Sequence, residues 1–198
     1  GTEVTERWKS QVDVIAFFLK QLRNADVPVL WRPYHEMNGA WFWWGMKEGE
    51  SGYTELWRML YERLTDFHGL DNLIWVWNAN EVKEGVGSYR SFYPGDEWVD
   101  VLATDVYSEG FDERNYEELL ALAGDKPIAI GECGQAPTVE KLREQPRWVW
   151  FMIWERGYSG WDEFAAFRQL FHSEEVLTRD ELPWVKVKEP KAHHPILR

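Results

Sequence analysis

The sequence has little cysteine and little positive charge, and it has no long hydrophobic run. Cys133 is the only cysteine in 198 residues, so no internal disulfide and no Cys-x-x-Cys motif can form. No stretch approaches the roughly 18 apolar residues that span a bilayer, and no basic segment followed by an apolar run marks a signal segment. Acidic residues outnumber basic ones by 34 to 22, a net charge of -12. That charge repels phosphate backbones and anionic lipids, so nucleic acid and membrane surfaces are not expected partners.

Tryptophan is unusually abundant, with 14 residues, and 44% of the chain is hydrophobic. This content is enough for one domain with a core, which we expect over residues 1–183. After Pro183 the chain turns basic and Pro-rich, and residues 184–198 are expected to form a C-terminal tail. Several tryptophans lie beside polar residues, an arrangement that suits the C–H faces and hydroxyl groups of a sugar.

Short apolar runs alternate with amphipathic stretches along the chain. The predicted strands cover residues 27–31, 73–77, 98–104, 126–130 and 148–153. The predicted helices cover residues 10–24, 53–67, about 115–123, 138–144 and 161–171. In the first helix, Val14, Ile15, Phe18, Leu19 and Leu22 are the expected core positions, and residues 81–93 are expected to form a loop. The alternation predicts an α/β fold with a parallel sheet.

Polar and aromatic side chains follow each predicted strand. They are His35 and Glu36, Asn78 and Asn80, Asp105 and Tyr107, Glu132, and Trp154. The carboxyl ends of parallel strands share one face of the sheet, so we expect these side chains to meet there. Two glutamates beside tryptophan rings are suited to glycosidic bond cleavage, in which one carboxyl protonates the leaving oxygen and the other attacks the sugar.

The surroundings of the two glutamates predict different protonation states. Glu36 lies among His35, Trp41 and Trp43, where loss of water favours the protonated acid. Glu132 is flanked by glycines that leave room for hydrogen-bond donors, which favour the ionised form. The sequence therefore predicts one acid and one nucleophile.

Other readings of these residues are less specific. Asn78, Asn80 and Glu81 could shape distal sugar subsites or simply be polar loop residues. No metal site is expected, since His35-Glu36 lacks a second histidine at helical spacing. Cys133 has no nearby histidine partner in the sequence, so a packed thiol is expected rather than a nucleophile. Trp75, Trp77, Trp148 and Trp150 alternate along strands and are expected to be core or barrel-lining residues.

The ordered motifs resemble glycoside hydrolase family 26, whose best-known members are endo-β-1,4-mannanases on a (β/α)8 barrel. The matching stretches are Trp31-Arg-Pro-Tyr-His-Glu-Met-Asn-Gly, the following Trp-Phe-Trp-Trp-Gly, Asn72-Leu-Ile-Trp-Val-Trp-Asn, Tyr93-Pro-Gly-Asp, Val99-Asp-Val, Asp105-Val-Tyr and Gly131-Glu-Cys-Gly. The resemblance implies hydrolysis of β-mannan with no cofactor, and secretion, because that polymer is extracellular.

Carried over by position, the resemblance implies a retaining double-displacement mechanism. Glu36, after the fourth barrel strand, would be the general acid/base, and Glu132, after the seventh, the nucleophile. In retaining enzymes the two carboxyl groups lie about 5–5.5 Å apart. His35 would bond the sugar next to the nucleophile, and Tyr107 would hold Glu132 through its phenol. The resemblance also implies that Trp41 and Trp154 stack against sugar rings.

The chain is short for this fold, because a (β/α)8 barrel usually takes about 250 residues. The strand that resembles the fourth of the barrel begins near residue 27, so the first three βα units are expected to be missing. Either the chain is a fragment or an incomplete gene product, or another chain supplies these units. A β-glucanase or xylanase with the same machinery is the enzymatic alternative. A non-catalytic carbohydrate binder or an inactive fragment is the other alternative.

Overall fold

The computed structural model describes residues 1–107, 111–154 and 161–182. The predicted tail over residues 184–198 lies outside the described residues, and its separation from the domain stays a prediction.

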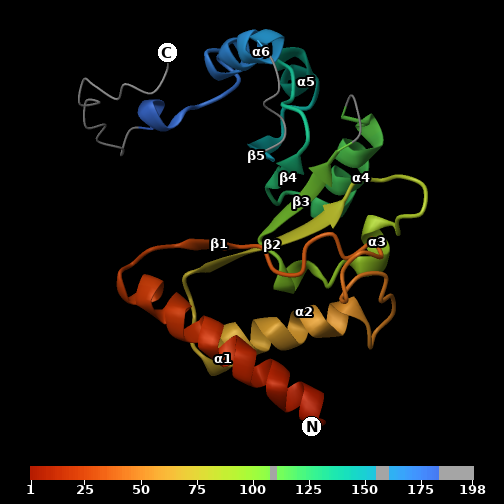
Figure 1. The fold of residues 1–198 in the computed structure, drawn as a ribbon, viewed down its shortest axis with the longest axis vertical. Helices are drawn as coiled ribbons and strands as arrows, with labels where there is room; N and C mark the ends of the chain where they lie inside the picture. Colours follow the sequence, from red (N-terminus) through yellow and green to blue (C-terminus); the bar gives the residue numbers. More distant parts are fainter. Residues whose placement is uncertain (108–110, 155–160, 183–198) are drawn as a thin grey trace.

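Five strands form one parallel sheet, as the sequence predicts, and their order is β1-β2-β3-β4-β5. The strands are β1 (Val29–Trp31), β2 (Leu73–Asn80), β3 (Val101–Val106), β4 (Ile128–Cys133) and β5 (Trp148–Ile153). Figure 1 shows them as a curled sheet with the helices packed along its outer side. An α/β fold is confirmed, and the order of the strands places their carboxyl ends along one continuous edge.

Three of the strands end differently from the prediction, although β5 has the expected bounds. Asn78, Asp105 and Glu132 lie inside β2, β3 and β4, whereas the sequence predicts strands that end before them. Pairing continues through these polar residues, because Asn80 lies opposite Asp105 and Asp105 lies opposite Glu132. The sheet itself therefore fixes the positions of these polar side chains.

The helices are α1 (Glu3–Asn24), α2 (Tyr53–Tyr61), α3 (Tyr89–Phe92), α4 (Glu113–Ala123), α5 (Val139–Glu144) and α6 (Trp161–Phe171). Helices α2 to α5 lie between successive strands, whereas α1 precedes β1 and α6 follows β5. A π-helical turn, η1 (Glu62–Phe67), continues α2, and 3₁₀ turns occupy η2 (Asp96–Trp98) and η4 (Arg179–Glu181). None of the helices in the described part of the chain is long and apolar enough to cross a membrane.

Local capping explains two errors in the predicted helices. The first helix begins at Glu3 rather than near residue 10, because the Thr2 side chain accepts a hydrogen bond from the Thr5 N–H group. The segment 81–93 is not all loop, since Ser88 caps the short helix α3 in the same way. As predicted, Gly124 ends α4, with a φ of 59° that favours glycine.

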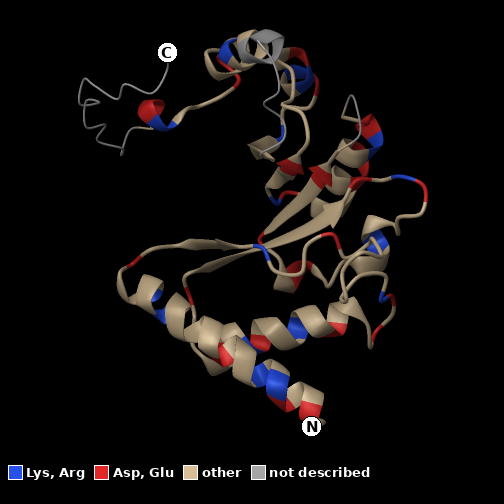
Figure 2. Cartoon of the chain, in the orientation of Figure 1, with Lys and Arg blue, Asp and Glu red and all other residues tan. Residues whose placement is uncertain are grey.

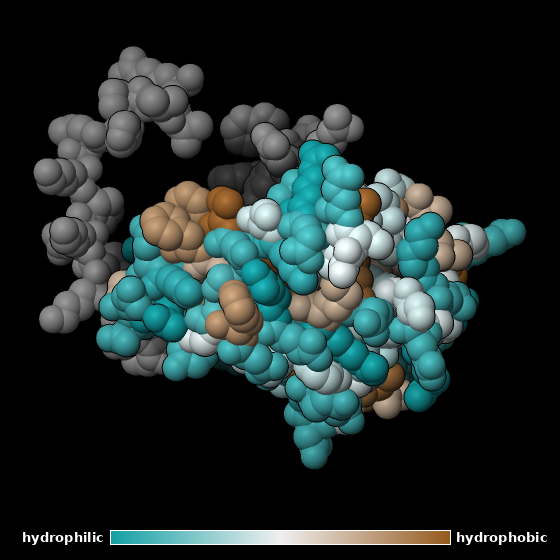
Figure 3. Space-filling view, turned by 90° about the horizontal axis from the view of Figure 1, so that it is seen from below, coloured by the Kyte–Doolittle hydropathy of each residue, from teal (hydrophilic) through white to brown (hydrophobic). Residues whose placement is uncertain are grey.

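The main core lies between the sheet and helices α1, α2 and α4. Trp57, Trp77 and Tyr89 are its largest buried side chains, and Trp75 is buried with them as expected. Of the five core positions predicted in helix α1, Leu19 is buried, whereas Val14, Ile15, Phe18 and Leu22 are exposed. The other buried residues of the helix are Val12 and Ala16. Seen from below, hydrophobic residues interrupt the mostly hydrophilic surface (Figure 3).

A smaller apolar cluster occupies the inner side of the sheet. Val76, Val101, Ala103 and Ala129 form it, with Trp150 packed against them. Towards the β1 edge this cover is absent among the described residues, since Leu30 is 55% exposed and Ile74 is 36% exposed.

Candidate active site

The loop after β1 carries Glu36 in a backbone conformation that side chains rarely adopt. Its φ is 54°, and Tyr34 two residues earlier has a φ of 49°. Such conformations cost about 1–3 kcal/mol each, so surrounding contacts must hold them. One such contact is the Glu36 N–H group, which donates to the Asn78 carbonyl at 2.8 Å. The strained turn thereby points Glu36 across the ends of the strands.

Both oxygens of the Glu36 carboxyl accept a hydrogen bond. Asn80 Nδ2 donates to Oε1 at 2.7 Å, and Trp41 Nε1 donates to Oε2 at 2.6 Å. The glutamate is only 9% exposed. These contacts fix the carboxyl in one orientation without burying a charged partner beside it.

The side chain of Asn38 fixes the position of Asn80 through hydrogen bonds to its backbone. The Asn38 side chain accepts from the Asn80 N–H at 2.7 Å and donates to the Asn80 carbonyl at 2.9 Å. It also donates to the Gly87 carbonyl at 3.1 Å, and it is completely buried. The donor that contacts Glu36 is therefore itself fixed by a fully bonded asparagine.

Trp41 presents half of its surface to solvent while its edge contacts Glu36. The benzo end of the ring packs on Gly39, where an added Cβ would lie 2.0 Å from Cη2. A glycine at position 39 is thus required for the ring to reach the carboxyl. The arrangement leaves an exposed aromatic surface directly beside Glu36.

Glu132 is held by one donor on each carboxyl oxygen. Arg32 NH2 donates to Oε1 at 2.5 Å, and the Tyr107 hydroxyl donates to Oε2 at 2.7 Å. Burial and the bond to Glu132 raise the pKa of Tyr107, so its phenol keeps the proton that it donates. Glu132 is 5% exposed, and the guanidinium compensates its charge.

Gly131, next to Glu132 on β4, is required for steric reasons. A Cβ at this position would lie 1.7 Å from Asn78 Oδ1 and 2.7 Å from Asp105 Oδ1. Arg32 NH1 donates to that same Asn78 oxygen at 3.1 Å. The missing side chain lets the polar groups of β2 and β3 pack directly against β4.

Asp105 is completely buried beside these groups, and burial raises its pKa well above the ordinary 3.8. The carboxylates of Glu132 and Glu36 raise it further, while Arg32, 3.4 Å away, opposes the shift. The single guanidinium of Arg32 therefore lies against two buried carboxyls, those of Asp105 and Glu132.

His35 lies with Nε2 3.9 Å from Glu132 Oε1, beyond hydrogen-bond range. Burial and the nearby guanidinium of Arg32 lower its pKa, so the imidazole is neutral at neutral pH. Its ring contacts Phe42, with 5.0 Å between the centroids, and Trp44 donates to its backbone carbonyl at 2.8 Å. A neutral ring of this kind can exchange a hydrogen bond with a ligand hydroxyl.

The structure brings most of the predicted site residues to one edge of the sheet. Glu36 and Glu132 both act electrostatically on His35, Asp105 and Tyr107, which places all five in one cluster. Figure 2 shows acidic segments at the ends of β3 and β4 and a basic segment at the end of β1.

Trp154 directly follows β5, where its N–H donates to the Cys133 carbonyl at 2.9 Å. Its ring is 48% exposed. The residue thus lies beside the strand that carries Glu132, as its place in the sequence indicates. Its role and those of Trp41, His35 and Tyr107 toward a sugar stay predictions.

Among the described residues, His35, Asp105 and Glu132 place ligand atoms within 4.8 Å of one another. Arg32 already bonds Glu132 and lies 3.4 Å from Asp105, so a metal cation would have to displace this guanidinium. These carboxyl groups thus already have a cation beside them, the guanidinium of Arg32, in the place where a metal ion would bind. Cys133 is a packed thiol, as predicted: it is fully buried, and burial raises its pKa to about 12.

Sequence reasoning gave no role to Arg32 or Asn38 and left Asn80 and Asp105 as loop residues or strand ends. Arg32 could have been found, because it is the one cation in the segment that precedes His35-Glu36. Asn38 could not, since its partners at residues 80 and 87 are known only once the chain is folded.

Comparison with known proteins agrees with this geometry. The model of the protein family described as "Glycosyl hydrolase family 26" matches residues 1–181. A "Mannan endo-1,4-beta-mannosidase" of Thermothelomyces thermophilus is 41% identical over 178 residues, covering 86% of this chain and 35% of the relative. Another, from Bacillus subtilis strain 168, is 32% identical over 195 residues, covering 89% of this chain and 52% of the relative.

Solved structures are similar over the same region. GH26A from Muricauda sp. MAR_2010_75 superposes with a TM-score of 0.85 at 48% identity, covering 92% of this chain and 61% of that one. A beta-mannanase from a symbiotic protist of the termite Reticulitermes speratus, solved with a gluco-manno-oligosaccharide, gives a TM-score of 0.79 at 32% identity, covering 92% and 57%. The chain thus spans a third to three fifths of the length of these relatives. It belongs to glycosyl hydrolase family 26.

Proposed function

We propose that this chain carries the catalytic glutamates of a retaining endo-β-1,4-mannanase. Glu36 is the general acid/base, and Glu132 is the nucleophile. The observation that carries this assignment is the contrast between the two carboxyls. Glu132 is paired with a guanidinium and a phenol, whereas Glu36 is held by the neutral donors of Asn80 and Trp41.

The reaction follows from these contacts. The Glu132 carboxylate attacks the anomeric carbon while Glu36 passes its proton to the oxygen of the leaving sugar. Water then attacks the glycosyl ester, with Glu36 taking the proton from that water. Arg32 and Tyr107 each donate a hydrogen bond to Glu132 and orient its carboxyl for the attack. Neutral His35 offers a hydrogen bond to a hydroxyl of the sugar beside Glu132.

The substrate assignment rests on the relatives named mannan endo-1,4-beta-mannosidase. The exposed ring of Trp41, and that of Trp154 after β5, suit stacking against sugar faces. Because such polymers lie outside cells, we place the action of the protein there. We further propose that the five strands are part of a (β/α)8 barrel, since the exposed side chains of Leu30 and Ile74 at the β1 edge suit contact with a neighbouring unit.

The roles of the two glutamates can be tested separately. Glu132→Ala should lower hydrolysis of β-mannan to about 1% or less. Added azide should restore cleavage of an activated mannoside by occupying the vacated space, giving the α-glycosyl azide. Glu36→Ala should slow cleavage of β-mannan by about 10²–10⁴-fold and, with azide, give the β-product.

The control variant is Glu140→Gln, which removes an exposed carboxyl on α5 and should leave hydrolysis unchanged. Reducing-sugar release on β-mannan, β-glucan and xylan ranks the polymers. Activity retained by Glu132→Ala without azide, or faster release from glucan or xylan, would contradict the assignment.

A further inference from the structure

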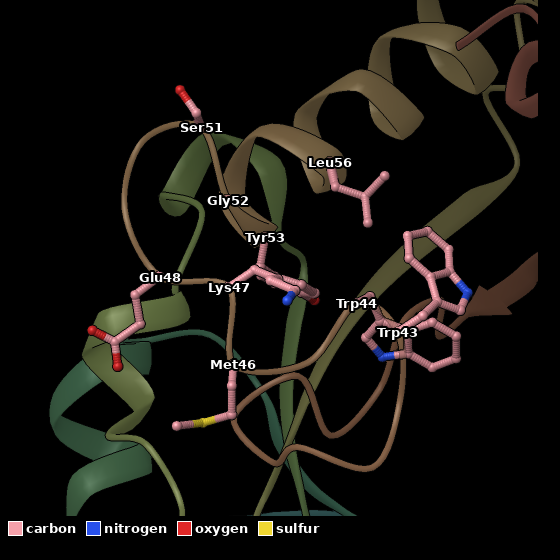
Figure 4. Close-up of a pocket in the computed structure, with 9 residues that line it drawn as sticks. All are labelled: Trp43, Trp44, Met46, Lys47, Glu48, Ser51, Gly52, Tyr53 and Leu56. Atoms are coloured by element: carbon pink, nitrogen blue, oxygen red, sulfur yellow. The ribbon is translucent and has the colours of Figure 1, made fainter. Parts of the chain in front are cut away.

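A pocket lies between the loop after β1 and the start of α2 (Figure 4). Its volume is about 560 Å³, within the range of about 300–1,000 Å³ that is typical of small-molecule sites. Trp43, Trp44, Lys47, Ser51 and Tyr53 are among its lining residues. None of them belongs to the set that contacts Glu36 or Glu132.

Two tryptophans provide apolar walls of different orientation. The rings of Trp43 and Trp44 lie 5.5 Å apart and are nearly perpendicular, at 84°. Trp43 is 65% exposed, although its ring also contacts Tyr34 at 5.8 Å. An exposed indole held in place by two other rings offers a flat, pre-ordered surface, which costs little entropy on binding.

The rest of the lining is mixed. Met46 and Leu56 are apolar, whereas Lys47, Glu48 and Ser51 are exposed polar side chains on the loop that leads to α2. The hydroxyl of Tyr53 is buried beneath the pocket and is not accessible to a ligand there. A ligand that carries hydroxyl groups could form hydrogen bonds with the exposed polar side chains.

The pocket is joined to the active site through Trp44. Its indole nitrogen donates to the His35 carbonyl at 2.8 Å. Its ring stacks on Phe42 at 4.4 Å, and Phe42 contacts the His35 ring at 5.0 Å. The wall of the pocket and the sugar-facing side of the active site are therefore built from one continuous set of rings.

We propose that this pocket binds a pyranose unit of the polysaccharide away from the bond that is cleaved. A pyranose has an apolar face to stack on Trp43 and a rim of hydroxyl groups for the polar side of the pocket. The proposal rests on the proposed function, because it assumes that the ligand of the neighbouring site is a polysaccharide. It predicts that long substrates gain from the pocket and short ones do not.

The test compares Trp43→Ala with the native chain on long and short β-1,4-manno-oligosaccharides. The ratio of kcat/KM for the long to the short substrate should fall about tenfold, the value of one good aromatic contact. Phe67→Ala is the matched control, since Phe67 is 66% exposed and lies on η1. It should leave the ratio unchanged.

A second variant leaves both tryptophans intact. Ser51→Arg places a long side chain at the pocket and should lower the same ratio without lowering the melting temperature. Titration of each variant with the long oligosaccharide measures binding independently of hydrolysis. If the native chain hydrolyses no substrate but binds the long oligosaccharide more tightly than Trp43→Ala does, the result would support the pocket as a sugar site and reject the proposed enzymatic function. Normal hydrolysis with an unchanged ratio in both variants would reject the pocket alone.

Discussion

Replacement of Arg32 by methionine tests the charge arrangement most directly. Arg32 bonds Glu132 at 2.5 Å and lies 3.4 Å from Asp105, and the side chains of these two acids are 6% and 0% exposed. Removing one partner of a buried pair costs about 3–5 kcal/mol. Arg32 itself is 25% exposed, and burial favours the neutral form of Asp105, so we expect the lower end, about 3 kcal/mol at neutral pH.

The loss should depend on pH in a defined direction. Without the guanidinium, Glu132 is a buried carboxylate with no cation, and protonation relieves this. The difference in unfolding free energy between native and Arg32→Met should be smaller near pH 4 than at neutral pH. Urea unfolding at both pH values measures it. Arg32→Lys keeps the charge and should recover part of the loss.

Arg114→Met serves as the control, because the pair that Arg114 forms with Asp112 lies on the surface, and no measurable change is expected. A loss below about 1 kcal/mol at neutral pH, or an equal loss at both pH values, would refute the reasoning.

Two further predictions concern Asp105 and Asn38. Because burial raises the pKa of Asp105, the stability that this one carboxyl contributes is fully present below its ordinary value of 3.8 and is lost as pH rises through the folded value. Asp105→Asn should therefore flatten the unfolding free energy over that window and cost little at neutral pH; a loss of about 3–5 kcal/mol there would mean that the native Asp105 is ionised. Asn38→Ala should lower kcat about 10–100-fold with little change in KM, because it loosens the donor to Glu36; a rise in KM at constant kcat would contradict this positioning role.

Much of the site could be predicted because strand ends are visible in the sequence. The polar residues after the apolar runs, including Glu36 and Glu132, do lie along one edge of the sheet. The strand bounds were less accurate, since Asp105 and Glu132 continue the pairing of β3 and β4. The sequence pattern predicts that a strand ends at a polar side chain, whereas here the pairing continues through Asp105 and Glu132.

The faces of α1 and the support of Glu36 could not be predicted. Periodicity shows that apolar residues recur, but Val14 and Phe18 are exposed while Val12 and Ala16 are buried. Which side packs depends on the neighbouring elements rather than on the helix alone. The contacts of Asn38 with Asn80 and Gly87 likewise join segments more than 40 residues apart.

Gly131 sets a limit on how this protein can be engineered. The space beside its α-carbon is already filled by an amide oxygen of Asn78, at 1.7 Å from where a methyl group would begin. A saturation library at this codon should return glycine alone among folded clones, even though its backbone is ordinary strand. Redesign of substrate preference therefore has to work through the loops and leave this part of β4 untouched.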